Sequence, residues 1–278
     1  MKWKALLDRK QFIETFSKEL SLELSLLQDV GTPTSYSFLV TADMIKEGFY
    51  LLPADPSCHI KIELVPFIKC VLLDPVDSSN ITYRIIEIVV GEGASVIYRT
   101  EDRLPDCAKK YQFFKIVVQK HGLFSQEAWQ SGGLVQANAY RCLLQGYSAA
   151  VMYSSRVHAQ GKERHQLFFS QTHEGSCSKS QVQVKAVVDG KSQCKYQGTI
   201  SIKKDAVDSQ AHQQHTALTL SPDAQVVATP NLEVLTNKVT CGHGAAIAHI
   251  DDNHLFYLRL RGIPLSQARA LIVDSFLL

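Results

Sequence analysis

The sequence predicts a mainly β protein assembled from similar strand-and-turn units, with helical segments at its two ends. Between about residues 35 and 240, helical periodicity is absent, and short runs rich in Val, Ile, Thr, Tyr and Phe follow one another, as strands prefer. Turn-forming residues recur at intervals of 15, 14, 15, 15 and 18 residues, at Gly146, Gly161, Gly175, Gly190, Asp205 and Asp223. Such regular spacing indicates stacked units that each hold one strand of about eight to ten residues and one turn.

The individual runs show the alternation of half-buried strands. Within residues 180–188, Val182 and Val184 fall on one face while Gln181 and Gln183 fall on the other, because residues two apart in a strand share a face. The run therefore has one apolar and one polar side. An antiparallel meander and a parallel β-helix would both produce such strands at this spacing, so the periodicity by itself leaves the two architectures open.

Helical signals appear at the N-terminal end of the chain. Residues 1–28 carry apolar side chains at spacings of three and four with Lys and Glu between them, and a Gly-Thr-Pro sequence then interrupts the pattern. We therefore expect three segments: an N-terminal helical segment over residues 1–34, a β core over 35–250, and a C-terminal helical segment over 251–278.

The C-terminal segment predicts two consecutive helices. Residues 251–253 supply N-cap candidates for a helix over 254–261, and Gly262 occupies the position of a left-handed C-cap. Pro264 suits the first turn of the second helix, because its fixed backbone angle is compatible with that position. The apolar stripe expected on the second helix consists of Leu265, Ala268, Leu271, Ile272 and Phe276.

Charge, hydropathy and cysteine content argue against several functional classes. The 278 residues carry 29 basic and 27 acidic side chains without a clustered basic block, so we expect no binding to nucleic acid or to an anionic membrane. Charges interrupt the N-terminus too early for a signal peptide, and no run approaches the roughly 18–20 apolar residues of a transmembrane helix. The seven cysteines are widely spaced without a Cys-x-x-Cys pair, which argues against disulfides and structural zinc and for a reducing cytoplasm.

The pair Cys241 and His243 is the strongest candidate for chemistry. A thiol and an imidazole stand two residues apart in a glycine-rich segment, so on a strand they would point the same way with Cα atoms about 6.5 Å apart. One metal ion could bridge them, but iron or zinc takes about four ligands, and two do not complete a site. The alternative is a buried free cysteine beside a hydrogen-bonded histidine.

Three segments, in order along the chain, resemble the SufB/SufD family, the scaffold proteins of the Suf iron–sulfur cluster assembly machinery. They are residues 195–202, 230–234 and 241–263, and the last of these, which includes Cys241 and His243, is the most specific. The resemblance implies the family fold, a right-handed parallel β-helix flanked by helices, and so favours the β-helix over the meander.

Within the family, the chain resembles SufD more than SufB. SufB-type proteins carry a cysteine, proposed to receive sulfur, a few residues before a Pro-x-(Ile/Leu)-Glu-Val segment, where this chain has Ala224; a methyl group is neither a nucleophile nor an iron ligand. SufB-type chains also follow the late histidine with glutamate, where Gly244 stands here, whereas the Cys-x-His-Gly pattern of SufD-type chains is present. The chain is shorter at both ends than full-length relatives, and the strand around His212 and His215 departs from the family pattern.

The resemblance implies a noncatalytic, SufD-like subunit of an iron–sulfur assembly scaffold. It would pair through the β-helix with a SufB-like chain, or with a second copy of itself in isolation, and hold a SufC-type ATPase through its C-terminal helices. A transient cluster would lie at the interface with Cys241 and His243 as ligands, and this chain alone would bind none tightly. The expected partner contacts are Phe256, Arg259, Arg261 and Gly262.

Other histidines give weaker signals, and two rival functions stay open. His212 and His215 are three apart, hence on opposite faces of a strand, which disfavours a shared metal site. His249 near Asp251 and Asp252 suggests an acid–base pair, although helix capping explains the aspartates better. One rival is a β-helix enzyme acting on polysaccharides, for which the β region lacks clustered carboxylates. The other is a degenerate scaffold that only dimerises.

Overall fold

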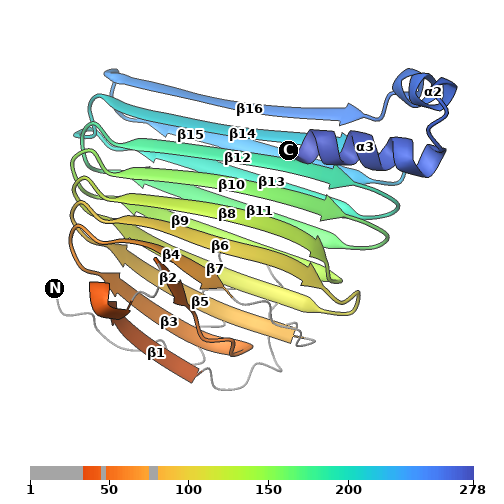
Figure 1. The fold of residues 1–278 in the computed structure, drawn as a ribbon. Helices are drawn as coiled ribbons and strands as arrows, with labels where there is room; N and C mark the ends of the chain where they lie inside the picture. Colours follow the sequence, from red (N-terminus) through yellow and green to blue (C-terminus); the bar gives the residue numbers. More distant parts are fainter. Residues whose placement is uncertain (1–33, 45–47, 75–80) are drawn as a thin grey trace, which may run out of the picture.

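Each turn of the chain contributes one strand to each of two eight-stranded parallel sheets, so the strands form a parallel β-solenoid (Figure 1). The computed structural model describes residues 34–44, 48–74 and 81–278. Strands adjacent in the chain lie in different sheets, and each pairs in parallel with strands two positions away. The predicted β-helix is therefore confirmed, and the meander is excluded. The helix predicted over residues 1–28 lies outside the described residues.

The two sheets alternate along the chain. Sheet A contains β1 (Thr34–Val40), β3 (Ser57–Leu64), β5 (Ile81–Val90), β7 (Lys109–Val118), β9 (Val135–Leu144), β11 (Arg164–His173), β13 (Gln193–Ile202) and β15 (Gln225–Val234). Sheet B contains β2 (Phe49–Leu51), β4 (Lys69–Asp74), β6 (Ser95–Leu104), β8 (Leu123–Gly132), β10 (Ala150–Ala159), β12 (Lys179–Val188), β14 (Ser209–Thr219) and β16 (Val239–His249). The short helix η2 (Ala42–Met44) precedes β2, and α2 (Asp252–Leu260) and α3 (Leu265–Leu277) follow β16.

The side chains that point inward from the two sheets form the core. Because parallel strands stack in register, equivalent positions superpose from turn to turn: the rings of Phe114, Tyr140 and Phe169 stack on successive strands of sheet A. Their centroids are 4.6 and 4.8 Å apart, close to the spacing of strands in a sheet. The predicted alternation of β12 is also present, since Val182 and Val184 are buried and the glutamines beside them are exposed.

The evenly spaced glycines lie where successive turns of the chain touch. A Cβ atom on Gly175 would lie 2.1 Å from the carbonyl oxygen of Gly146, so only glycine permits this approach. On the opposite edge of the solenoid, Gly190 has a φ of +68°, in the left-handed region that favours glycine. The regular spacing of turn residues in the sequence thus follows from the stacking of turns of equal length.

The C-terminal helices are present with small shifts of their bounds. The Asp251 side chain accepts a hydrogen bond of 2.8 Å from the backbone N–H of Asn253, so α2 begins two residues earlier than predicted. Gly262, with a φ of +84°, follows the helix end as predicted. Pro264 is the residue before α3 and not part of its first turn. Among the described residues, no helix has the length and apolarity needed to cross a membrane.

The apolar stripe of α3 differs in part from the prediction. Val273 and Leu277 are buried against the outer face of sheet B, whereas Leu265 and Leu271 are exposed. Three predicted members of the stripe do pack inward: Ala268, Ile272 and Phe276. Arg156 of β10 fixes the end of α3, because its Nε donates a hydrogen bond of 2.6 Å to the carbonyl oxygen of Leu277. Helical periodicity alone does not tell which side of α3 meets the sheet.

Candidate functional site at the terminal turn

The last turn of the solenoid is formed by β15 and β16, and among the described strands each pairs on one side only. This turn exposes side chains that face inward: Ile247 is 48% exposed, whereas Ala217, its register partner on β14, is fully buried. The terminal turn therefore presents uncovered apolar side chains and two strand edges. Proteins normally cover or blunt such edges, because their unpaired backbone groups attract another strand.

Cys241 and His243 lie near the start of β16, on the face that points inward. Their register partners on β14 are Ala211 and Gln213, which are both buried inside the solenoid. Cys241 is half-buried and packs against a buried cluster that includes Ala211, whereas His243 is exposed at the open end. The two side chains share a face, as the alternation of a strand requires.

The arrangement offers part of a metal site. Across the described ranges, no three His, Cys, Asp or Glu side chains are placed to hold one metal ion. The thiol of Cys241 and the imidazole of His243 are donors that suit iron, but they are two of the four that a tetrahedral site takes. Because His243 is exposed at an uncovered turn, a second molecule lying on this surface could reach it and add donors.

Ala224, the position expected to distinguish SufB-type from SufD-type sequences, lies far from this pair. Ala224 directly precedes β15, while Cys241 lies near the start of β16, at the opposite edge of the solenoid. The ten residues of β15 separate the two edges, and a strand of that length spans about 33 Å. Gly244 points away from the interior, and a Cβ atom there would meet no atom within 4 Å.

His212 and His215 lie on opposite faces of β14, as the strand alternation predicts. His212 is exposed beside Gly242, where a Cβ atom would come within 3.3 Å of the His212 Nδ1. His215 is fully buried, in register with Ala245 of the terminal turn, and its ring stacks on Tyr196 with centroids 4.9 Å apart. Burial lowers the pKa of His215 to about 4. The sequence did not show that His215 lies directly beneath the terminal turn, because this position follows only from the strand register.

His249 and Asp251 do not form an acid–base pair. The Nδ1 of His249 hydrogen-bonds to the hydroxyl group of Thr219. Asp251 caps α2, and its Oδ2 lies 3.7 Å from the Nδ1 of the exposed His254. The capping interpretation of the aspartate is therefore confirmed.

Helix α2 presents a second exposed surface close to the end of β16. Phe256 and Leu260, one helical turn apart, are 61% and 69% exposed, and the guanidinium of Arg261 lies 4.6 Å from the ring centroid of Tyr257. The predicted partner contacts are all exposed here: Phe256, Arg259, Arg261 and Gly262. Large apolar side chains exposed together on a short helix are typical of a protein–protein contact.

A cleft of about 820 Å³ lies between α2, the exposed side of α3 and the outer face of sheet B, beside the contact that α3 makes with the sheet. Its helical side is mostly apolar and includes Leu258, Leu271 and Phe276, whereas its sheet side is mostly polar and includes Gln183 and Lys185. The cleft therefore connects the α2 surface with the sheet that ends at the terminal turn.

Comparisons with known proteins identify a family whose model covers the C-terminal motif. The family model described as "SUF system FeS cluster assembly, SufBD core domain" matches residues 59–276. The iron–sulfur cluster assembly protein SufD of Escherichia coli is 32% identical over 102 residues, which are 37% of this chain and 24% of that protein. SufD of Bacillus subtilis is 26% identical over 211 residues, 74% of this chain and 47% of that protein.

The chloroplastic protein ABCI7 of Arabidopsis thaliana is 36% identical over 90 residues, 32% of this chain and 19% of that protein. The matched part of this chain thus spans less than half the length of each of these relatives. The family model, in contrast, covers the solenoid from within β3 to within α3. The chain therefore belongs to the SufBD core family of the SUF iron–sulfur cluster assembly system.

Proposed function

We propose that this chain is the SufD-like subunit of a Suf-type iron–sulfur cluster assembly scaffold, pairing with a SufB-like chain and a SufC-type ATPase in the cytoplasm. The chain itself catalyses nothing and supplies one side of a surface on which the cluster, its cargo, is built. Family membership supports the assembly role. The free state of all seven cysteines fits a reducing compartment.

The exposed terminal turn is the main support for pairing with a SufB-like chain. The edges of β15 and β16 suit strand addition by another chain, in which backbone hydrogen bonds supply affinity and inward side chains supply specificity. Val234, Leu235 and Ile247 are exposed apolar side chains of this turn and its loop. Covering each would contribute about 1 kcal/mol, since roughly half of each side chain is already buried. A second solenoid of this family fits, because it can present a matching pair of edges.

The candidate ligands follow from the same surface. Cys241 and His243 face the covered side of such a pairing, and the partner adds the donors that this chain lacks. A cluster that needs both chains forms only in the complex and leaves when the chains rearrange. In the absence of a SufB-like chain, the same edges suit a second copy of this chain.

The ATPase is proposed to bind the helix surface formed by Phe256, Arg259, Leu260 and Arg261. The exposed apolar pair Phe256 and Leu260 would supply the buried centre of the contact, and the arginines its polar rim. Arg156 holds α3 to sheet B, so movement of the ATPase would be passed to the solenoid through a fixed helix.

Co-purification tests the pairing. The full chain is expressed with SufB-type and SufC-type proteins from the same genome, and the variant Ile247→Glu is compared with Met152→Glu, which changes a side chain equally exposed (48% and 49%) on the outer face of β10. Ile247→Glu should weaken binding of the SufB-type chain at least tenfold, because a charge would be buried in the contact. Failure of the unmodified chain to associate, or equal binding by both variants, would refute the proposal.

The ligand role has a separate test. Anaerobic reconstitution of the complex, followed by absorption spectroscopy, should show a loss of bound cluster in His243→Ala, while His212→Ala serves as the matched control on the outer face of β14. Pull-down should show that both variants still bind the partner. A complete cluster in His243→Ala would support the interpretation of a scaffold that only dimerises.

A further inference from the structure

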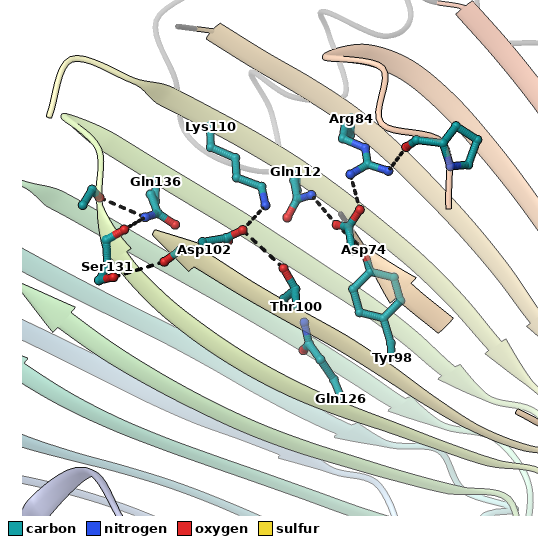
Figure 2. Close-up of polar contacts among 12 residues, drawn as sticks. Asp74, Arg84, Tyr98, Thr100, Asp102, Lys110, Gln112, Gln126, Ser131 and Gln136 are labelled. Atoms are coloured by element: carbon teal, nitrogen blue, oxygen red, sulfur yellow. Dashed lines mark hydrogen bonds and ion pairs between the residues drawn. The ribbon is translucent and has the colours of Figure 1, made fainter. Parts of the chain in front are cut away.

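One layer inside the solenoid is rich in buried polar side chains. It lies between β6, β8 and β10 of sheet B and the starts of β7 and β9 of sheet A (Figure 2). The inward side chains of this layer are at most 3% exposed: Asp102, Lys110, Gln130, Gln136 and Asn138. Burying so many polar groups is costly unless each finds a hydrogen-bond partner.

The charges of the layer balance one another. Lys110 Nζ lies 2.5 Å from Asp102 Oδ1, and next to this pair Arg84 donates to Asp74 (Figure 2). Burial alone would raise the pKa of Asp74, but the charges of Arg84 and Lys110 outweigh it and hold that pKa below its usual value. Two carboxylates therefore face two cations, and the region is electrically neutral.

The hydrogen bonds of the layer, in contrast, are incomplete. Seven buried polar atoms have no protein partner: Asp102 Oδ2, Gln130 Nε2 and Oε1, Gln136 Oε1, Asn138 Nδ2 and Oδ1, and Ser155 Oγ. The register brings them together, because Asp102 pairs with Gln130 on the next strand of sheet B, and Ser155 of β10 pairs with Ala128, two residues before Gln130. On sheet A, Gln136 and Asn138 occupy the start of β9.

A small residue, Ala128, lies two positions before Gln130 on the inward face of β8. It is in register with Thr100 on one side and Ser155 on the other. Each neighbouring strand therefore carries a larger side chain at the equivalent position. The unpartnered amides and the carboxylate oxygen make the surroundings of Ala128 polar, which is a condition for buried water.

We propose that this layer binds a cluster of two or three ordered water molecules. Seven unpartnered atoms divided among waters that each make about three hydrogen bonds require about that number. A neutral guest fits, because the charges of Asp102 and Lys110 already cancel and an added ion would be buried without a counter-charge. The carbonyl and amino groups of Gln130 and Asn138 let a water molecule both donate and accept.

The layer is closed toward the terminal turn. His165, the register partner of Gln136 on β11, extends the polar layer by one strand. The other inward side chains that follow on this side of the solenoid are apolar and fully buried: Val157, Leu167, Val182, Val184 and Ala186. These residues separate the polar layer from Cys241 and His243. The waters are thus a fixed part of the fold, with slow exchange, and the layer is not a passage to the candidate site.

Water relaxation dispersion, which counts long-lived internal waters, tests the proposal on the full chain. The double variant Gln130→Leu/Asn138→Leu should hold two or three fewer such waters than the unmodified chain. Ile116→Leu, a change in the apolar half of β7, should leave the number unchanged. Equal numbers in the double variant and the unmodified chain would overturn the proposal.

A crystal structure of the unmodified chain at high resolution decides the matter if the double variant does not fold. Two or three water positions within hydrogen-bond distance of Asp102, Gln130 and Asn138 support the proposal. Amide groups that bond to one another with no density between them overturn it. A single peak with metal–oxygen distances of about 2.4 Å to these side chains would also overturn it, because the guest would then be a cation.

Discussion

Folding of this solenoid should be sensitive to mild acid because of His173. This histidine is fully buried at the end of β11, where its Nδ1 lies 2.7 Å from Ser178 Oγ and its Nε2 lies 2.8 Å from Ser180 Oγ. Both ring nitrogens are therefore hydrogen-bonded to serine hydroxyl groups, and Ser178 Oγ in turn lies 2.9 Å from Ser209 Oγ. Burial lowers the pKa of His173 from 6.5 to about 4.

The sign and size of the effect follow from proton binding. Between about pH 6.5 and 4 the unfolded chain binds a proton at this histidine and the folded chain does not, so stability rises with pH in this window and is lost as pH falls. The full difference in the pKa of His173 between the unfolded and folded chain corresponds to about 3 kcal/mol of unfolding free energy. About 2 kcal/mol of this stability is lost when the pH falls from 7.5 to 5.

Urea unfolding at these two pH values tests the reasoning. His173→Gln retains hydrogen-bonding groups but does not titrate, so its loss of stability on going to pH 5 should be about 2 kcal/mol smaller than that of the unmodified chain. The control His212→Gln removes an exposed histidine of β14 and should leave the pH dependence unchanged. A His173→Gln variant with the pH dependence of the unmodified chain would refute the argument.

Three further predictions concern packing, the C-terminal helix and the buried ion pair. Gly175→Val should destabilise the chain by about 3 kcal/mol or more in thermal unfolding, because its Cβ would strike the carbonyl of Gly146. Arg156→Ala should speed amide hydrogen exchange in α3 about tenfold, since the helix loses a charged hydrogen bond. Lys110→Met should cost about 3–5 kcal/mol in urea unfolding, because the Asp102 carboxylate would stay buried without its cation.

Each of these has a matched control. Gly161→Ala, where a Cβ meets nothing within 4 Å, should cost only about 1 kcal/mol from its positive φ. Arg164→Ala removes an exposed arginine of β11 and should leave exchange in α3 unchanged. Lys120→Met breaks an exposed ion pair with Glu92 and should cost less than about 1 kcal/mol. A variant that behaves like its control would contradict the corresponding contact.

Local order in this protein was predictable from the sequence. The alternation in β12 identified its buried face, and the same rule placed His212 and His215 on opposite faces of β14. Turn glycines marked the edges of the solenoid, and Asp251 and Gly262 marked the two ends of α2. These features depend on contacts within a few residues, which the sequence displays directly.

The architecture required more than local pattern. Alternation and turn spacing suit antiparallel and parallel sheets equally, and the family resemblance, not the periodicity, predicted the β-helix. For α3 the predicted stripe was partly wrong, since Val273 and Leu277 face sheet B while Leu265 and Leu271 are exposed. Helical periodicity identifies several positions around the helix that could face the core, and packing against a particular surface decides which of them become buried.

The sequence by itself determined the strands, their faces, the turns and the Cys241–His243 pair. Only the tertiary structure decided what lies beside them. Stacking brings residues about 30 positions apart into register, as with Asp102 and Gln130, so isolated polar residues in separate strands become one buried layer. It also makes β16 a terminal strand among those described. His243 faces inward like the equivalent residues of inner strands, but it is exposed because no further turn of the described chain covers it. Such contacts leave no local signal, because they join residues that are distant along the chain.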